Sequence, residues 1–205
     1  MSMPALLSHF GIDKARFVTT TGQVVFDGVR THDTGGFTHV DYGTVTPVAR
    51  HTFHGGTDEP SDSLHQAAWW DDEKAITRHV EAMECAFPGF IYLPADDDMA
   101  PCWVGVVDTG RGRFKIGILL RRDRGLPFVR LVDGPRLGVN AGRRWVPSPH
   151  LFLNGNLCIA DQNDWNPDVH TAATAAGWAA HWLAAYTEWR ITRRWPVEGV
   201  HAVAS

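Results

Sequence analysis

The sequence predicts an α+β fold, and three observations along the second half of the chain support that prediction. A segment with helical hydrophobic spacing comes first, three short strand-like runs follow it, and a long tryptophan-rich helical segment comes last. Strands that are separated from the helices in sequence are typical of an antiparallel sheet covered by helices. We therefore expect a helix, an antiparallel meander, an irregular loop and a final helix, in that order.

The first predicted helix spans residues 64–87. Its apolar residues recur at intervals of three and four, which places them on one face of a helix. Ser63 is the expected N-cap, and Pro88-Gly89 ends the helix because proline cannot continue it. The expected buried face consists of Ile76, Val80, Met83 and Phe87.

Three strand-like runs follow, at 102–108, 113–121 and 126–133. Apolar residues alternate with others from Phe114 to Leu120, as expected when one face of a strand is buried. Short glycine-containing turns join the runs, which favours an antiparallel meander. The next stretch, 134–149, is rich in Gly, Pro and Arg and has no sustained period, so we expect a loop there.

A long helix is predicted from Pro167 onward. Proline is favourable in the first turn of a helix, and four aromatic residues then recur at helical spacing on one face. A stripe of this kind is typical of a helix packed in the core. Arginines near the C-terminal end favour the helix dipole, and Pro196 stops the helix. The stripe consists of Trp178, Trp182, Tyr186 and Trp189, and the arginines are Arg190, Arg193 and Arg194.

Residues 1–62 are predicted to be a strand-rich N-terminal extension with a polar linker, and residues 63–205 a second domain. Short strand-like pieces broken by Gly and Thr run from 17 to 54, and the polar stretch 55–63 closes the segment. The extension is rich in histidine, and His51 and His54 could in principle offer two metal ligands. No cysteine accompanies them and the spacing is irregular, so we expect no metal.

Composition and charge exclude several classes of protein. The 205 residues are 44% hydrophobic and 20% charged, as in a globular protein, and no stretch approaches the roughly 18 consecutive apolar residues of a membrane helix. The net charge of -4 argues against a nucleic-acid partner. The three cysteines are odd in number and widely spaced, so we expect no disulfide framework and a cytoplasmic protein. No cofactor is indicated.

One of the cysteines, Cys158, stands in a stretch that suggests chemistry. It follows the pair Asn154-Gly155, which favours a positive φ and a tight turn, so the cysteine would be presented on a fixed loop. A lone cysteine is usually a small buried apolar residue. Cys85, on a predicted helix, and Cys102, at the start of a strand, keep that interpretation. The neighbours of Cys158 favour a nucleophile.

These neighbours resemble the active-site stretch of ubiquitin-conjugating enzymes. That family has a His-Pro-Asn tripeptide before the active cysteine, a Gly-x-Ile/Val-Cys-Leu box around it and a Trp-x-Pro cluster after it. With Pro-His in place of Pro-Asn and a Leu-Cys pair, the chain is most similar to the ubiquitin-conjugating-like proteins of bacterial antiphage operons, over residues 64 to 201. The matching segments are Ser148-Pro149-His150, Gly155-Asn156-Leu157-Cys158-Ile159 and Trp165-Asn166-Pro167.

The resemblance implies a ubiquitin-conjugating-like fold and an acyl transfer through cysteine. Cys158 would take the activated C-terminus of a ubiquitin-like protein, or another activated C-terminus, as a thioester from a ubiquitin-activating-like enzyme. It would then pass that group to an amine of an acceptor protein. The helix at 64–87 would be the docking surface for the activating enzyme.

His150 stands where the family has an Asn that stabilises the oxyanion or holds the loop. An imidazole N–H can likewise donate, and unlike Asn the ring can titrate near neutral pH. The resemblance therefore makes His150 a second catalytic candidate. The residues expected to support the loop are Pro149, Asn154, Gly155, Trp165 and Pro167.

Two other functions stay open at this point. The chain could be a non-catalytic module of the same fold that binds a ubiquitin-like partner, in which case a mutant without the thiol would keep its biological activity. It could also be a thiol hydrolase that uses Cys158 with His150 or His170, which requires a histidine within hydrogen-bond reach of the sulfur. We expect neither a membrane nor a nucleic acid as partner.

Overall fold

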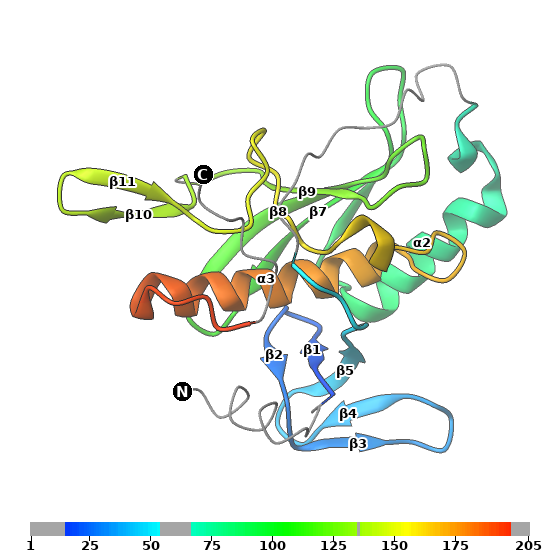
Figure 1. The fold of residues 1–205 in the computed structure, drawn as a ribbon. Coiled ribbons are helices and arrows are strands. Elements are labelled where there is room, and N and C mark those ends of the chain that lie inside the picture. Colours follow the sequence, from blue (N-terminus) through cyan, green and yellow to red (C-terminus); the bar gives the residue numbers. More distant parts are fainter. Residues whose placement is uncertain (1–14, 54–66, 135, 198–205) are drawn as a thin grey trace.

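A computed structural model of the chain describes residues 15–53, 67–134 and 136–197 (Figure 1). A curled antiparallel sheet has the strand order β6-β7-β8-β9, a long helix lies along it, and a shorter helix packs beside the long one. One core cluster joins the sheet and both helices. The strands are β6 Ile91–Leu93, β7 Cys102–Asp108, β8 Arg113–Leu119 and β9 Phe128–Leu131; the helices are α2 Glu73–Ala86 and α3 Ala172–Thr192; the 3-10 helices are η1 Trp69–Asp71 and η2 Gln162–Asp164.

The predicted antiparallel meander is confirmed. Each strand pairs with the next, and β7 pairs with β8 from Cys102 opposite Leu119 to Asp108 opposite Arg113. The side chains that alternate along β8 are buried where the pattern requires it, since Ile116 and Ile118 are fully buried. The sequence does not predict β6, because three residues are too few to show an alternation.

The start of α2 differs from the prediction. The helix begins at Glu73 rather than at residue 64, because the Asp72 carboxylate caps it by accepting the backbone N–H of Lys74 over 3.0 Å. Ser63, the predicted cap, lies outside the described residues. The predicted buried face is confirmed where the helix ends, at Met83 and Phe87.

The start of α3 also differs from the prediction. Thr171, and not Pro167, precedes the helix, and its side chain forms a capping box with Thr174. Pro167 lies in the loop before it, where its carbonyl oxygen accepts a hydrogen bond from the Arg78 guanidinium. The aromatic stripe is confirmed as core, and every one of its four members is buried.

The C-terminal end of α3 lies close to the predicted stop. Thr192 is its last residue, and Arg193 then adopts the left-handed conformation, with φ 61°, that commonly ends a helix. The described chain continues to Val197, and Trp195 packs back against the core. This turn returns the chain toward the loop that carries Cys158.

The stretch 134–149 contains a β-hairpin rather than the predicted loop. β10 Gly138–Ala141 pairs antiparallel with β11 Arg144–Pro147, and Gly142 in the turn has φ 62°. The hairpin is fixed at its base, because the Gly138 N–H donates to the Tyr186 hydroxyl of α3 over 3.2 Å. Each strand has only four residues, and glycine and arginine interrupt its apolar positions, so no alternation is visible in the sequence.

The described part of the N-terminal extension forms a five-stranded antiparallel sheet with the order β2-β1-β5-β4-β3. Val18 and Phe53 belong to the same core cluster as the tryptophans of α3, so the extension packs into the main core. The predicted strand-like pieces are strands, whereas the division at 62–63 stays a prediction because residues 54–66 lie outside the described part. The strands are β1 Phe17–Thr19, β2 Val24–Val25, β3 Val29–Thr31, β4 Phe37–His39 and β5 Gly43–Pro47.

Candidate functional site

The residues before Cys158 form a small antiparallel loop. Leu151 bridges Leu157, and the Phe152 N–H donates to the Asn156 carbonyl over 2.9 Å. The predicted tight turn is present at its tip, where Gly155 has φ 85° and the Asn154 side chain accepts the Asn156 N–H. The loop therefore folds back on itself and brings position 158 beside position 150.

Cys158 is held through its backbone. Its N–H donates to the carbonyl oxygen of His150 over 3.0 Å. On either side of it, the Ile159 N–H reaches back to the Leu157 carbonyl over 3.0 Å, and the Leu157 N–H donates to the Val129 carbonyl of β9 over 2.7 Å. The cysteine thus lies on non-repetitive backbone that is tied directly to the sheet.

The Cys158 side chain is buried. It is 1% exposed, and the adjacent Leu157 and Ile159 are 2% and 0% exposed. None of the three cysteines forms a disulfide, and only Cys85 is exposed. A bulky acyl donor can therefore reach the Cys158 sulfur only after neighbouring groups move.

His150 contributes to the site with its backbone and its ring. It has a left-handed conformation, φ 55°, and its carbonyl oxygen accepts both the Cys158 N–H and the indole N–H of Trp182 over 3.0 Å. The imidazole lies between two aromatic rings, with centroids 4.9 Å from Trp195 and 5.9 Å from Phe53. Trp195 also packs on Trp182, at 5.5 Å between centroids. Phe53 lies in the N-terminal extension and Trp195 follows α3, and no spacing in the sequence relates them to His150.

The predicted supporting residues divide into two groups. Pro149, Asn154 and Gly155 lie in the same loop segment as His150 and Cys158. Trp165 is buried, and its indole N–H donates to the Arg124 carbonyl over 2.9 Å, while the Pro167 carbonyl accepts a hydrogen bond from Arg78. Trp165 and Pro167 therefore support the β8–β9 connection and the approach to α3.

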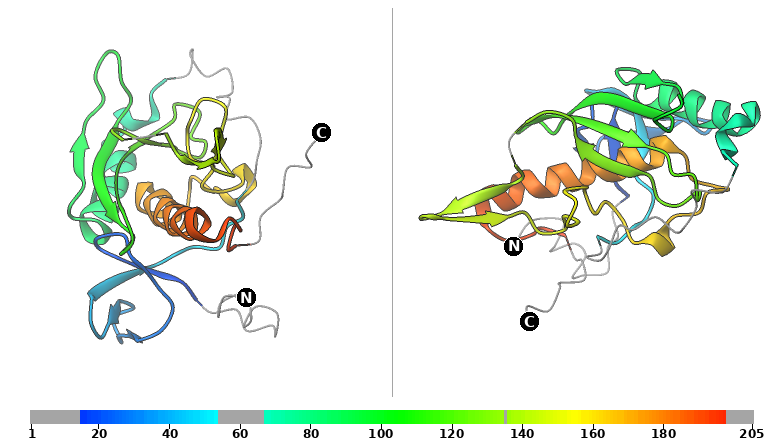
Figure 2. Two further views of the ribbon diagram at one scale, coloured as in Figure 1. Left: turned by 90° about the vertical axis from the view of Figure 1, so that its left-hand side faces the viewer. Right: turned by 90° about the horizontal axis from the view of Figure 1, so that it is seen from above.

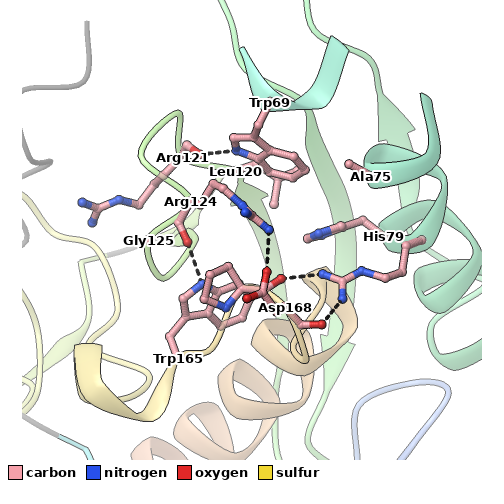
Figure 3. A pocket seen from close by; sticks show the side chains of 11 residues that line it. Trp69, Ala75, His79, Leu120, Arg121, Arg124, Gly125, Trp165 and Asp168 are labelled. Carbon is pink, nitrogen blue, oxygen red and sulfur yellow. Dashed lines mark hydrogen bonds and ion pairs between the residues drawn. The ribbon is translucent and has the colours of Figure 1, made fainter. Parts of the chain in front are cut away.

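A cavity of about 170 Å³ lies between α2, the β8–β9 connection and the loop before α3 (Figure 3). Neither Cys158 nor His150 lines it. Figure 3 shows the Arg124 side chain pointing toward the Asp168 carboxylate. The Arg124 guanidinium donates to that carboxylate over 3.0 Å. Arg78 closes one wall by donating to the carbonyl oxygens of Pro167, Asp168 and His170. The arginines of this cavity thus hold three segments of the fold together.

A buried histidine pair joins the extension to α3. The His51 Nδ1 lies 2.8 Å from the Ala49 carbonyl and so donates to it, while its Nε2 lies 3.0 Å from the Nδ1 of His181. With His51 neutral, its Nε2 accepts the proton of His181. Burial lowers the pKa of His51 to about 4, and burial together with His51 lowers the pKa of His181 well below its usual value. No sequence signal connects these two residues, which are 130 positions apart.

The described side-chain contacts of His170 are with residues outside the loop 148–158. Its Nδ1 accepts the Asn166 N–H over 3.0 Å, and its ring packs on Trp165 and Trp178. Burial lowers its pKa. These contacts are those of a residue that stabilises the loop before α3.

The described residues offer neither a metal site nor a membrane-spanning helix. Within them, no group of three or more His, Cys, Asp or Glu side chains is placed to bind a metal ion. Both ring nitrogens of His51 form hydrogen bonds, one with the Ala49 carbonyl and one with His181. His54 lies outside the described residues. Among the helices that the structure describes, none is both long enough and apolar enough to span a membrane.

Comparison with known proteins gives one family. The family model described as "Type II CBASS E2 protein" matches residues 79–202, which include most of α2, the whole meander, the Cys158 loop and α3. Neither the curated proteins nor the solved structures contain a match. The element order of the structure is that of a ubiquitin-conjugating-like α+β fold. The chain belongs to the type II CBASS E2 family, which gives it an E2-like role in antiphage defence.

Proposed function

We propose that the protein carries an activated protein C-terminus as a thioester on Cys158 and transfers it to an acceptor amine. The observation that supports this most is the pairing of Cys158 with His150 by a backbone hydrogen bond, on a fixed loop, in a chain of the E2 family. Catalytic groups are commonly placed on irregular backbone that a rigid scaffold holds in position. The β9 anchor and the sheet supply that scaffold.

The proposed chemistry has two balanced steps. In the first, the Cys158 sulfur, having lost its proton, attacks the carbonyl carbon of the activated C-terminus; a new C–S bond forms, and the sulfur of the activating enzyme leaves as a thiolate. In the second, an acceptor amine attacks the same carbon, the C–N bond forms, and the Cys158 thiolate leaves. The amine loses a proton, and the thiolate can take one up.

His150 is proposed to act on both steps through its place beside the cysteine. Its carbonyl oxygen holds the Cys158 backbone, which fixes where the thioester carbonyl forms. Its ring carries an N–H that can stabilise the negative charge developing on that carbonyl oxygen, which in other enzymes contributes about 3 kcal/mol. Both uses require that His150 keep its left-handed backbone.

The partners proposed are a ubiquitin-activating-like enzyme, a ubiquitin-like protein and an acceptor protein, in the bacterial cytoplasm. Three cysteines that form no disulfide fit a reducing compartment. We propose α2 as the docking surface for the activating enzyme. Its exposed side includes Glu73, Lys74 and Glu81, which offer charged contacts of both signs.

The test is a reconstitution with the activating enzyme of the same operon, ATP and the candidate modifier proteins. Intact mass spectrometry should show an adduct that a thiol reductant removes and that Cys158→Ala abolishes. Cys85→Ala is the matched control, because Cys85 is exposed and should react with general thiol reagents without carrying the adduct. An adduct that persists in Cys158→Ala would contradict the proposal.

The burial of Cys158 favours a second candidate, a non-catalytic binding module of the same fold. A thiol that is 1% exposed is also what a structural cysteine requires. A phage-protection assay distinguishes the thioester carrier from the binding module. Full protection by Cys158→Ala, with the variant folded and expressed at the normal level, supports the binding module, and lost protection supports the thioester carrier.

A further inference from the structure

The cavity beside α2 contains a buried hydrogen-bond donor that the fold itself does not use. His79 lies on α2, is 4% exposed and lines the cavity, and its Nδ1 accepts the Ala172 N–H over 3.1 Å. Because Nδ1 is the acceptor, the neutral ring carries its proton on Nε2. Nε2 forms no hydrogen bond with any residue that the structure describes. Figure 3 shows the His79 ring pointing from α2 into the cavity.

The position of His79 at the start of α3 strengthens this donor. Figure 1 and the right-hand view of Figure 2 show the first turns of α3 beside α2, at the opposite end of α3 from the β10–β11 hairpin. The N–H that His79 accepts is that of Ala172, the first residue of α3. Hydrogen bonds in a chain polarise one another, so the bond to Nδ1 makes the Nε2–H a better donor. A buried donor of this kind destabilises the fold unless an acceptor meets it.

The cavity also has an excess of positive charge. Burial, and then the charges of Arg78 and Arg124, lower the pKa of His79 to about 4, so the ring is neutral at neutral pH. Among the described lining residues, the one carboxylate that faces these two guanidinium groups is that of Asp168. The third lining arginine, Arg121, is already in an ion pair. Positive charge beside a buried donor favours a negatively charged acceptor.

The rest of the lining is apolar and has room for one aromatic ring. The indole N–H groups of Trp69 and Trp165 both donate to backbone carbonyl oxygens, so these two side chains offer the cavity their ring surfaces. Leu120 and Ala75 add aliphatic surface. The volume of about 170 Å³ is close to that of an engineered cavity of about 150 Å³ that binds benzene. The walls therefore fit an apolar body of about that size.

We propose that this cavity binds a small carboxylic acid, whose carboxylate accepts hydrogen bonds from His79 Nε2 and Arg124 and whose apolar body lies against the two indole rings. Arg124 already holds a carboxylate here, since it donates to Asp168 over 3.0 Å. The carboxylate of the ligand competes with that of Asp168 for this guanidinium. The site is separate from the thioester chemistry, because the lining of the cavity does not include Cys158.

The test is isothermal titration calorimetry of the full chain with benzoate at neutral pH. Arg124→Gln should weaken benzoate binding about tenfold, because it removes a charged donor. Asp168→Asn is the matched control, because it breaks the same ion pair but leaves the guanidinium and removes the competing carboxylate. It should bind benzoate at least as tightly as the wild type. Both side chains are largely exposed, so both variants should fold, and thermal melts check this.

The contribution of His79 has its own measurement. The proton resonance of its Nε2–H should move downfield when benzoate is added, because the N–H gains a charged acceptor. Benzamide has the same ring without the charge and should bind the wild type at least about tenfold more weakly than benzoate. His79→Phe keeps a ring and removes the donor, so it should reduce this preference for benzoate.

Four results would overturn the inference. Benzamide could bind the wild type as tightly as benzoate, or Arg124→Gln and Asp168→Asn could weaken benzoate binding equally, which would reduce the effect to the loss of their ion pair. The folded wild type could show no saturable binding of benzoate. Tighter binding of inorganic phosphate than of benzoate would assign the cavity to a phosphate group instead. Cys158→Ala should bind benzoate normally, so none of these results depends on the thioester chemistry.

Discussion

The N–H of Cys158 donates to the carbonyl oxygen of His150 over 3.0 Å, and the same oxygen accepts the indole N–H of Trp182. His150 therefore links the cysteine to α3 through one atom. Because Trp182 is fully buried, the position of this oxygen is set by the core rather than by the loop. The geometry around Cys158 then depends on residues far from it in sequence.

Trp195 should control access to Cys158. Its ring packs on His150 and Trp182. Its indole nitrogen is buried without a hydrogen-bond partner in the described structure, and burying an unsatisfied donor disfavours this packed position of the ring. Trp195→Ala should raise the rate of Cys158 alkylation by iodoacetamide about tenfold. Peptide mass spectrometry of timed samples measures the alkylation rate of Cys158, with Trp145→Ala as the control variant. Equal rates in the wild type, Trp195→Ala and Trp145→Ala would contradict a role of Trp195 in access to the thiol.

The histidine pair should make stability depend on pH. Both histidines have pKa values lowered in the folded protein, so below pH 6.5 the unfolded chain binds more protons and the free energy of unfolding falls as the pH drops toward 4. For His51 alone, a pKa lowered to about 4 corresponds to a loss of roughly 3 kcal/mol in the free energy of unfolding between neutral pH and a pH below 4.

The check is urea unfolding of the wild type and His51→Gln at several pH values. The variant should be less stable at pH 7 and its stability should vary less between pH 6.5 and 4.5, because one of the two shifted groups is gone. His32→Gln, at an exposed histidine of the same extension, is the control and should follow the wild type. Parallel curves for wild type and His51→Gln would contradict the role of the pair.

Tyr186 should hold the hairpin. Tyr186→Phe removes the hydroxyl that accepts the Gly138 N–H in a buried position, at a cost of about 1–2 kcal/mol. Hydrogen exchange followed by mass spectrometry should show faster exchange in 136–148 and little change in the meander. An unchanged exchange rate in that peptide would mean that apolar contacts, and not the Tyr186 hydroxyl, hold the hairpin against α3.

Arg78 should hold the loop before α3. Its guanidinium donates to three backbone carbonyl oxygens, those of Pro167, Asp168 and His170, and a lysine ammonium cannot reproduce that planar set. Arg78→Lys should lower the free energy of unfolding by about 1–3 kcal/mol. Arg30→Lys serves as control in the same denaturant titration, and an Arg78→Lys midpoint equal to that of the control would refute the role.

The sequence predicts those parts of the fold whose pattern is local. The alternation from Phe114 to Leu120 and the stripe from Trp178 to Trp189 are both local patterns. Ile116, Ile118, Leu120 and all four members of the stripe are buried as predicted, and Phe114 is half-buried. The start of α3 is misplaced because the first-turn preference of Pro167 is overruled by a tertiary contact with Arg78 and by the Thr171 cap. The hairpin is missed because glycine and arginine replace the expected apolar positions.

Only the part of the candidate site whose residues are close together in sequence can be predicted from the sequence. The motif brings Cys158, His150 and the Asn154-Gly155 turn together, since all lie within a dozen residues. The burial of the thiol, the packing of Phe53 and Trp195 on His150, and the His51–His181 pair join segments that are far apart in sequence. No single-sequence periodicity can predict such contacts.

The most direct measurement of the proposed role uses Cys158→Ser in the reconstituted reaction. An oxygen at this position should accept the same acyl group as an ester, so intact mass should show an adduct of nearly the thioester's mass that resists a thiol reductant and is released by mild base. Such an adduct, absent from Cys158→Ala, establishes residue 158 as the acyl carrier. A wild-type adduct that persists in both Cys158→Ser and Cys158→Ala with unchanged sensitivity to reductant would place the chemistry elsewhere.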